Sequence, residues 1–270
     1  THPRTWDGIV FLGDFADCKA VNPHLSGNAR AKEGLRLGAH LRAASVVYGL
    51  IDAACGYPKD RWMLLGNHED WVRQLVDRFP ELEDVLPRWA DIYPGARILP
   101  YRKSRTALSL GKLHFLHGYG KGGATALKTW LNAFNVNLVS GHIHRMERVT
   151  KTSAHGVISA WCLGYLGSTT LGDEYLEGPA NWSHGFGDLV VQPNGLFHLY
   201  PVDIVRGRCA PLWADRPPTA PTGSAPATTS SYPRRRGGGS GRDRPREGAP
   251  VRSARSGRGR SSATGVGSRG

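Results

Sequence analysis

The sequence predicts an α/β protein in which two packed sheets are flanked by helices. Short continuous apolar runs, typical of strands buried on both faces, alternate with stretches of helical apolar spacing through the first part of the chain. Strand-like runs dominate the second part. Strands and helices in this order build sheets that pack on each other, with the helices on the outside.

The first expected elements are a strand and a long helix. Residues 8–12 form a short apolar run that a Gly-Asp pair ends, so we expect a buried strand there. From 29 to 54, apolar residues recur at helical spacing, and the stretch closes at a Gly-Tyr-Pro sequence. We expect one long helix here, and an interruption at Gly34 or Gly38 is the alternative.

A second strand and two further helices follow. Residues 62–65 are the next short apolar run, and after a polar cluster the helical pattern resumes over 71–79. Residues 82–89 are bounded by prolines on both sides and are expected to form another short helix.

The remaining elements are mostly strands. Two runs around Gly111 indicate a hairpin, and an Asn-Gly pair at 194–195 predicts a tight turn between the last two strands. The expected strands are 106–110, 112–116, 136–139, 157–163, 189–192 and 196–205, and the expected helix is 124–134.

One folded domain, residues 1–209, is predicted to precede a disordered tail, residues 210–270. After Cys209 the composition changes to Pro, Ser, Thr and Ala and then to Arg and Gly, which cannot bury enough apolar surface to offset the entropy of ordering. From Pro233 onward, eleven arginines face two acids, a net of +9 that leaves about +4 of the formal +13 for the folded part. The strong basic character therefore belongs to the tail.

The four cysteines are widely spaced and form no C-x-x-C pair, so we expect no disulfides. No run approaches the roughly 18 apolar residues of a membrane span, and the N-terminus lacks a signal-peptide pattern. A cytoplasmic protein that does not associate with membranes is the expectation. Nothing in the sequence indicates an oligomeric state.

Four short polar segments carry the chemistry. Each follows an apolar run and so places polar side chains at the carboxyl end of a buried strand, where an enzyme of layered sheets assembles a metal site. The segments are Gly13-Asp14, Gly66-Asn67-His68-Glu69, His117-Gly118 and Gly141-His142-Ile143-His144.

These side chains offer oxygen and nitrogen ligands, which suit Mn, Fe or Zn rather than ions that prefer thiolates. Asp14 has two carboxylate oxygens and can bridge two cations, while Asn67 offers an amide oxygen. The ring nitrogens of His117, His142 and His144 complete the set. If the tip after residue 139 is extended, His142 and His144 project to the same side, because the side-chain period of a strand is two.

Two divalent ions about 3.5 to 4 Å apart would stabilise the attacking and leaving oxygens of an in-line displacement at phosphorus, and would generate hydroxide near neutral pH. His68 directly follows Asn67 and so points elsewhere, towards a leaving group that it could protonate.

In this order and at these separations, the four segments resemble the calcineurin-like metallophosphoesterase family. The resemblance covers roughly residues 7–200. It implies a two-sheet sandwich flanked by helices, a dinuclear metal centre, and hydrolysis of phosphate mono- or diesters by in-line attack of a metal-activated hydroxide. It also implies that Asp14 bridges both ions, that Asn67, His117 and His142 complete one site and that His144 belongs to the other, with His68 and Asp14 in catalysis.

The family pattern begins with an Asp-x-His motif some two to three dozen residues before Gly-Asp, and this motif is absent here, since only thirteen residues precede Asp14. If the chain starts at Thr1, the second metal site keeps only Asp14 and His144 and should bind weakly. Because the chain does not begin with Met, we interpret the absence as the loss of the first strand from a longer, active protein.

Several polar residues outside the motifs have two interpretations. Asp17 and Glu69 either orient the ligands by hydrogen bonds or are solvated acids, and Arg145 either meets a substrate phosphate or is a surface charge. An aromatic and polar cluster at 181–187 could line a substrate cleft, although packing is the favoured interpretation. The remaining histidines are expected at the surface or in packing, and these are His24, His40, His114, His155 and His198.

Substrate class follows only from the resemblance, which favours an enzyme of phage or bacterial type acting on a phosphodiester or nucleic acid. The alternative function is a non-catalytic scaffold that binds nucleic acid non-specifically through the Arg-rich tail. The tail has no aromatic residues between its arginines for stacking on bases, so a solvated extension is the favoured interpretation.

Overall fold

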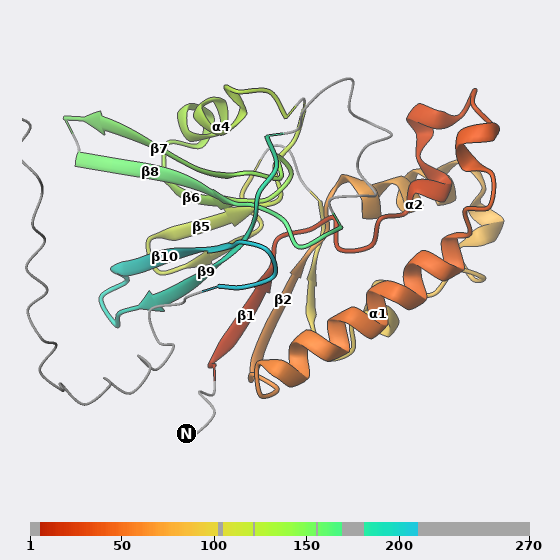
Figure 1. Ribbon diagram of the computed structural model, residues 1–270, viewed down its shortest axis with the longest axis horizontal. Coiled ribbons are helices and arrows are strands. Elements are labelled where there is room, and N and C mark those ends of the chain that lie inside the picture. The colour runs from red at the N-terminus through yellow and green to blue at the C-terminus, as the bar shows by residue number, and fades with distance from the viewer. Residues whose placement is uncertain (1–5, 102–104, 121, 155, 169–180, 210–270) are drawn as a thin grey trace, which may run out of the picture. The chain divides into compact units, whose positions relative to one another are not determined.

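The described residues of this computed structural model are 6–101, 105–120, 122–154, 156–168 and 181–209. All of them belong to one unit, which spans Thr1–Asp215. The predicted tail, 210–270, lies outside the described residues. The structure has the predicted α/β character, with parallel and mixed sheets flanked by helices (Figure 1).

The first sheet is parallel and three-stranded, in the order β1 (Gly8–Phe11), β2 (Asp60–Leu64), β3 (Arg97–Leu99). Figure 1 shows it between α1 and α2 on one side and the larger sheet on the other. The helices are α1 (Leu37–Ala54), α2 (Asn67–Arg78) and the short α3 (Trp89–Ile92), and they pack on the sheet through a core that includes Phe11, Tyr48 and Met63.

The second sheet is mixed and five-stranded, and β5, β6 and β8 are its parallel centre. Its order is β4 (Leu108–Leu110), β5 (Leu113–Leu116), β6 (Asn137–Ser140), β8 (Gly156–Leu163), β7 (Met146–Ser153). Helix α4 (Ala126–Phe134) covers its outer face through Leu127, Trp130 and Leu131. A separate antiparallel pair, β9 (His184–Val191) and β10 (Phe197–Ile204), forms the third sheet.

Alternation along the strands explains how the layers stack. On β1, Ile9 and Phe11 face the helix-side core, whereas Val10 belongs to a central core between the sheets. On β6, Leu138 packs under α4 and Val139 joins the central core. Strands with apolar residues on both faces are buried on both sides, which is why they appear in the sequence as continuous apolar runs.

Most predicted elements are confirmed, and two predicted helices need correction. The long helix is interrupted at Gly34, one of the two alternative positions: Gly34 has a left-handed backbone (φ 75°), so α1 begins at Leu37 rather than at 29, and a short 3₁₀ turn, Arg30–Lys32, precedes Gly34. The predicted helix over 82–89 is wrong. Pro87 has no N–H to donate and disfavours helical backbone at Leu86, so a 3₁₀ turn (Pro80–Leu82) and α3 flank a turn instead.

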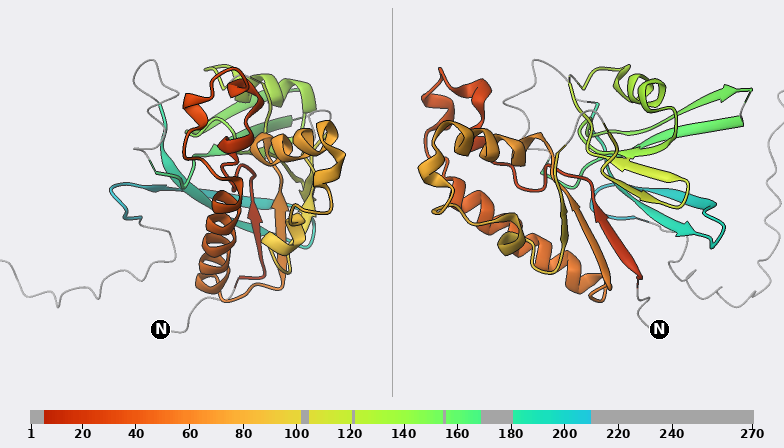
Figure 2. Two further views of the ribbon diagram at one scale, coloured as in Figure 1. Left: turned by 90° about the vertical axis from the view of Figure 1, so that its right-hand side faces the viewer. Right: turned by 180° about the vertical axis from the view of Figure 1, so that it is seen from behind.

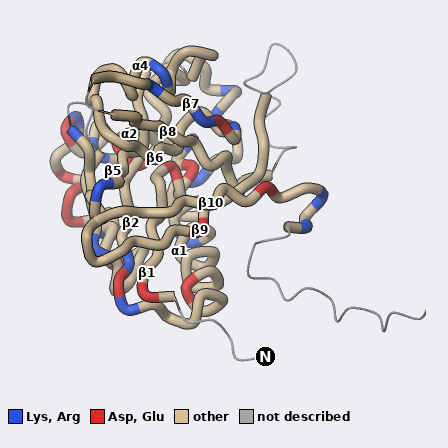
Figure 3. Tube along the Cα trace, turned by 90° about the vertical axis from the view of Figure 1, so that its left-hand side faces the viewer, with Lys and Arg blue, Asp and Glu red and all other residues tan. Residues whose placement is uncertain are grey.

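Strands β3 and β7 were not predicted, and the last hairpin forms a sheet of its own rather than part of one of the two sheets that were expected. The four cysteines are free, as predicted. Among the described residues, no helix combines the length and apolar character needed to cross a bilayer. Figure 3 shows Lys and Arg interspersed with Asp and Glu along the described chain.

Candidate metal centre

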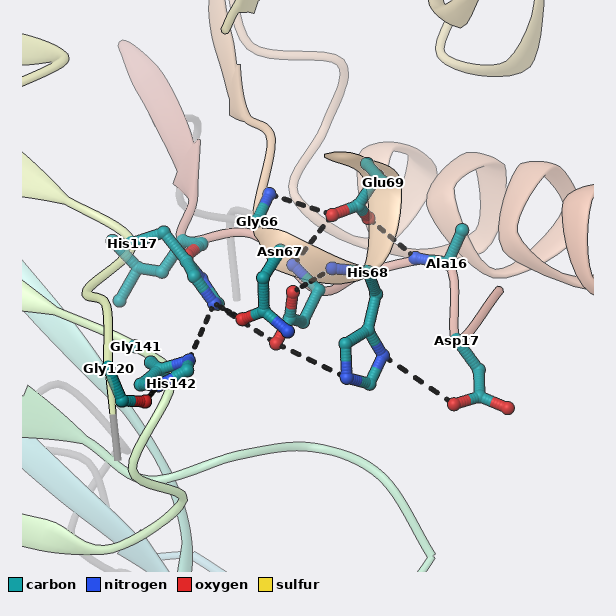
Figure 4. A network of polar contacts seen from close by, with 12 residues as sticks. Ala16, Asp17, Gly66, Asn67, His68, Glu69, His117, Gly120, Gly141 and His142 are labelled. Atoms are coloured by element: carbon teal, nitrogen blue, oxygen red, sulfur yellow. Dashed lines mark hydrogen bonds and ion pairs between the residues drawn. The ribbon is translucent and has the colours of Figure 1, made fainter. Parts of the chain in front are cut away.

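The polar segments from both large sheets meet at the carboxyl ends of β1, β2, β5 and β6. Asp14 lies just after β1, and Asn67 and His68 form the first turn of α2, directly after β2. His117 follows β5 and His142 follows β6. Figure 4 shows Asn67, His117 and His142 directed towards one another from these separate elements. The site therefore lies between the parallel sheet and the mixed sheet.

Three polar residues here adopt left-handed backbone, which is uncommon outside glycine. Their φ angles are 52° at Asp14, 70° at His142 and 57° at His144. The expectation that His142 and His144 lie on an extended tip is wrong, because the chain bends directly after β6. Such strained backbone persists only where the surroundings hold it, and it is concentrated at functional sites.

Two glycines make room for the ligands. A Cβ atom on Gly66 would overlap the carboxylate of Asp14. A Cβ atom on Gly13, whose φ is 92°, would lie 2.5 Å from Nδ1 of His117. Both positions exclude other residues while the side chains keep their present places.

Four candidate ligand atoms converge at His117. Its Nε2 atom lies 3.0 Å from Oδ2 of Asp14, 3.2 Å from Oδ1 of Asn67 and 3.3 Å from Nδ1 of His142. Ligand atoms of Asp14, His117 and His142 all lie within 4.8 Å of one another. The side chain of His117 is 1% exposed and that of Asp14 is 10% exposed, so the cluster is almost closed to solvent on this side.

Hydrogen bonds to main-chain carbonyls fix which nitrogen of each imidazole faces the cluster. Nδ1 of His117 lies 2.7 Å from the carbonyl oxygen of Leu12 and donates to it, which leaves the Nε2 lone pair facing Asp14. In His142, Nε2 lies 2.8 Å from the carbonyl oxygen of Gly120 and donates to it, so Nδ1 faces the cluster. The bond from His117 to Leu12 also joins the end of β5 to the end of β1.

This arrangement fits a divalent cation. Two nitrogen lone pairs, an amide oxygen and a carboxylate oxygen face one another at hydrogen-bonding distance, and they repel unless a proton or a cation lies between them. Ligands about 2.1 Å from one ion would be roughly 3.0 to 3.4 Å apart in octahedral or tetrahedral geometry. The observed separations from His117 Nε2, 3.0, 3.2 and 3.3 Å, match that range. The predicted group of Asp14, Asn67, His117 and His142 is thus brought together.

The protonation preferences of the cluster follow from burial and mutual charge. Burial disfavours ionised Asp14, but the imidazoles of His117 and His68 outweigh it and hold the pKa of Asp14 well below its usual range. Burial lowers the pKa of His117, while the Asp14 carboxylate and the Leu12 carbonyl raise it, and the net shift is upward. Burial and the nearby His117 lower the pKa of His142. One imidazole thus favours a proton and the other favours its neutral form.

Glu69 holds the main chain on both sides of the cluster through hydrogen bonds. Its side chain is fully buried and accepts the backbone N–H groups of Asp14 (3.0 Å), Ala16 (2.8 Å) and Gly66 (2.7 Å). The interpretation of Glu69 as a solvated acid is therefore wrong. These bonds fasten the loop after β1 to the start of α2 (Figure 4), and so they set the relative positions of Asp14 and Asn67.

His68 also faces Asp14. Its backbone N–H donates to Oδ1 of Asp14 over 2.9 Å, and its Nε2 lies 3.7 Å from Oδ2 of the same carboxylate. On the other side, its Nδ1 lies 3.6 Å from the exposed Asp17, and its ring stacks on Trp71 at 4.1 Å. His68 is therefore held at the edge of the cluster rather than inside it.

His144 is not in the group of ligand atoms that lie within 4.8 Å of one another. Its ring stacks on Tyr165 (5.3 Å) and meets Trp182 edge-on (4.6 Å), so the aromatic cluster predicted at 181–187 lies beside the metal motif. Burial lowers the pKa of His144 to about 4, so that its ring is neutral near pH 7.

Among the described residues, the histidines outside the motifs and outside 181–187 have other partners or lie at the surface. His24 meets Trp71 edge-on, His40 lies 3.7 Å from Asp17, and Nδ1 of His114 is hydrogen-bonded to Ser109. His198 is exposed, and His155 lies outside the described residues.

No family model matches the chain, and no curated protein matches it. The chemical interpretation therefore depends on the geometry of the cluster and on the order of its motifs.

Arg145 has a role that neither sequence interpretation included. Its guanidinium donates to Glu147 (2.6 Å) and to the carbonyls of Gly122 (3.0 Å) and Gly123 (2.9 Å), and its side chain is only 13% exposed. These bonds tie the loop after His117 to the turn that carries His142. Gly120, the acceptor for His142, lies on that same loop. The charge of Arg145 is thus paired with Glu147, and its guanidinium supports the loop whose Gly120 carbonyl accepts from His142.

Replacing Arg145 by alanine is expected to weaken divalent-ion binding by about 10-fold, because the Gly120 carbonyl loses its support and His142 becomes free to turn. Isothermal titration with Mn²⁺ measures the change in Kd. Arg208→Ala removes an exposed arginine and is the matched control. Equal affinities for the Arg145 and Arg208 variants would contradict this role.

Proposed function

We propose that the protein is a metal-dependent phosphoesterase that hydrolyses phosphate mono- or diesters. The observation that carries the proposal is the convergence of Asp14, Asn67 and His142 around the Nε2 atom of His117. The four come from four strand ends that are far apart in the sequence. An arrangement of lone pairs this close, oriented by main-chain carbonyls, is suited to holding a cation rather than to packing.

The order of the motifs supports the same function. Gly-Asp, Gly-Asn-His-Glu, His-Gly and Gly-His-x-His occur in the order that resembles calcineurin-like metallophosphoesterases. Sheets packed against each other, with helices outside, agree with the architecture that this resemblance implies. The assignment to that particular fold is part of the proposal.

Asp14, Asn67, His117 and His142 would hold one ion. His144 and Asp14 would contribute to a second, and the nitrogen and oxygen ligands suit Mn, Fe or Zn. When bound, such ions lower the pKa of water towards neutrality and stabilise negative charge on phosphoryl oxygens. The chain's own groups would orient the ester and move protons, and His68 is placed to protonate a leaving oxygen at the edge of the cluster.

We favour phosphodiesters, including nucleic acid, as the resemblance suggests. A direct comparison of bis-p-nitrophenyl phosphate with p-nitrophenyl phosphate separates diesterase from monoesterase activity.

Release of p-nitrophenol in millimolar Mn²⁺ tests the function, since excess metal also fills a weak second site. Activity should fall by at least about 100-fold in Asp14→Asn, which removes the carboxylate charge that the ions require, and in His142→Ala. Asp203→Asn, at an exposed position on β10, is the control and should keep wild-type activity. Release that is equal in wild type and both site variants would refute the assignment, as would wild-type protein with no Mn²⁺-dependent release from either ester.

A further inference from the structure

Helix α1 is unusually poor in charge for a helix on the outside of a protein. Among its 18 residues, Arg42 and Asp52 are the only arginine, lysine or acidic side chains. Asp52 faces inward, where it is buried and paired with Arg61 at 2.5 Å. A surface helix normally has a polar outer face, and a helix that is apolar all round is normally covered.

The outer face of α1 is a continuous apolar strip. Its centre consists of Val46, Val47 and Leu50, which are 63%, 46% and 66% exposed. Small residues extend the strip towards both ends of the helix, namely Ala39, Ala43, Gly49, Ala53 and Ala54, all of which are exposed. In the left view of Figure 2, α1 lies at the front of the molecule, with no other described element covering it.

The face does not contribute to the core of its own chain. The side chains of α1 that pack inward are Leu41, Ala44 and Tyr48, which share a core with β1 and α3. Single exposed aliphatic residues are ordinary, but a contiguous apolar strip along a whole helix indicates an interface. The metal cluster lies elsewhere, at the strand ends, so this face is independent of the proposed activity.

We propose that a second copy of this chain docks on the outer face of α1, with the two helices antiparallel about a two-fold axis. Within α1 the strip is close to symmetric about residue 48, with large residues near that point and small ones on either side. An axis near residue 48 puts Val46 of one copy opposite Leu50 of the other and Ala43 opposite Ala53. A strip that matches itself in this way is what a two-fold interface requires, because the same patch is used twice.

Charge agrees with this partner. In the antiparallel arrangement, Arg42 of one copy lies beside Ala54 of the other, at the carboxyl end of the partner's α1. The helix dipole makes that end negative, so each Arg42 lies in a favourable potential, and the two-fold axis repeats this contact. A parallel arrangement would instead bring the two Arg42 side chains together.

The size of the face is consistent with a reversible dimer. Val46, Val47, Leu50 and the adjacent Tyr57, which is 66% exposed, are its largest side chains. With the alanines they would bury on the order of 700 Å² per copy, near the ~800 Å² per partner of a standard interface. We therefore expect dissociation in the micromolar range rather than an obligate dimer.

Sedimentation equilibrium of the full chain from about 1 to 200 µM tests the proposal. Wild type should approach twice its 29.4 kDa mass at the upper end. Leu50→Glu should raise the dissociation constant by at least about 20-fold, because it places a carboxylate in the apolar centre of the interface. Arg42→Glu should raise it by a smaller factor, about 3- to 10-fold, by reversing the charge beside the helix end.

Val157→Glu is the matched control, since Val157 is 60% exposed on β8, away from α1, and this variant should dimerise like wild type. Circular dichroism shows whether each variant is folded. A wild-type protein that stays monomeric at 200 µM overturns the proposal whatever the variants do. A dimer that the folded Leu50→Glu protein retains, or that Val157→Glu disrupts equally, places the interface elsewhere and also overturns it.

Discussion

Replacing His117 by alanine is expected to abolish binding of the first divalent ion, with an affinity at least about 100-fold below that of wild type. Nε2 of His117 is the atom around which Asp14, Asn67 and His142 gather, at 3.0, 3.2 and 3.3 Å. Without the imidazole, the three remaining ligands keep no common centre. The Asp14 carboxylate also loses its nearest positive neighbour. No other residue in this group can replace both contributions.

Equilibrium dialysis against Mn²⁺ or Zn²⁺, followed by elemental analysis, measures the loss. Wild type should retain about one tightly bound ion per chain, because the described residues contain one compact group of candidate ligands, Asp14, His117 and His142. His198→Ala removes an exposed imidazole on β10 and should keep wild-type stoichiometry. A thermal shift separates lost binding from lost folding, since an ion that binds only the folded state raises its melting temperature. A folded His117→Ala protein that retains the ion with wild-type affinity would contradict the site.

The candidate ligands could be predicted from the sequence because each follows a strand that is apolar on both faces. Such strands end at the edge of a buried sheet, so Asp14, Asn67, His117 and His142 had to lie near strand ends. The order of the motifs then indicated which ends meet. The layers were predictable for the same reason, since continuous apolar runs require cover on both faces.

Other features of the site have no sequence signal. Hydrogen bonds to the carbonyls of Leu12 and Gly120 determine which ring nitrogen of His117 and of His142 faces the cluster. Every residue type has a main-chain carbonyl, so the sequence does not mark these acceptors. The left-handed backbone at His142 is imposed by its surroundings and overrides the local preference for extended structure. Arg145 was interpreted either as a phosphate contact or as a surface charge. Its partners include the carbonyls of Gly122 and Gly123, and only the folded loop brings these carbonyls to it.

Strand β7 was missed because its residues are mostly charged or hydroxyl-bearing and do not form an apolar run. One face of β7 is solvated. The strand is held in the sheet by its antiparallel pairing with β8, which no hydrophobic pattern in the sequence indicates. The helix predicted over 82–89 is wrong for a local reason: Pro87 lies inside that range, and the prediction considered only the prolines that bound it. Long-range pairing and single prolines were thus the two main sources of error.

Replacing Glu69 by alanine is expected to lower the free energy of unfolding by about 3 to 5 kcal/mol, the largest effect on stability that we predict. The carboxylate accepts three backbone N–H groups, from Asp14, Ala16 and Gly66, and the side chain is fully buried. A buried donor left without an acceptor costs roughly 1 to 3 kcal/mol. Water entering the space left by the side chain would recover part of the loss. Because domains of this size are stable by only about 5 to 15 kcal/mol, this variant should unfold at far lower urea concentration.

Glu69→Gln keeps the size of the buried side chain and changes its hydrogen bonds, so it separates their two contributions to stability. The remaining amide oxygen can still accept from Asp14 and Gly66, which share Oε2 in the wild type, but the new NH₂ group then faces the N–H of Ala16. We expect a loss of about 1 to 2 kcal/mol and weaker metal binding, by about 10-fold, because Asp14 is held less firmly. Glu83→Ala, at an exposed position, should stay within about 0.5 kcal/mol of wild type. If Glu69→Ala unfolds at the same urea concentration as Glu83→Ala, the three N–H groups have other acceptors. If instead Glu69→Gln is as unstable as Glu69→Ala, the negative charge matters more than the hydrogen bonds, and the proposed role of Glu69 in aligning Asp14 with Asn67 is wrong.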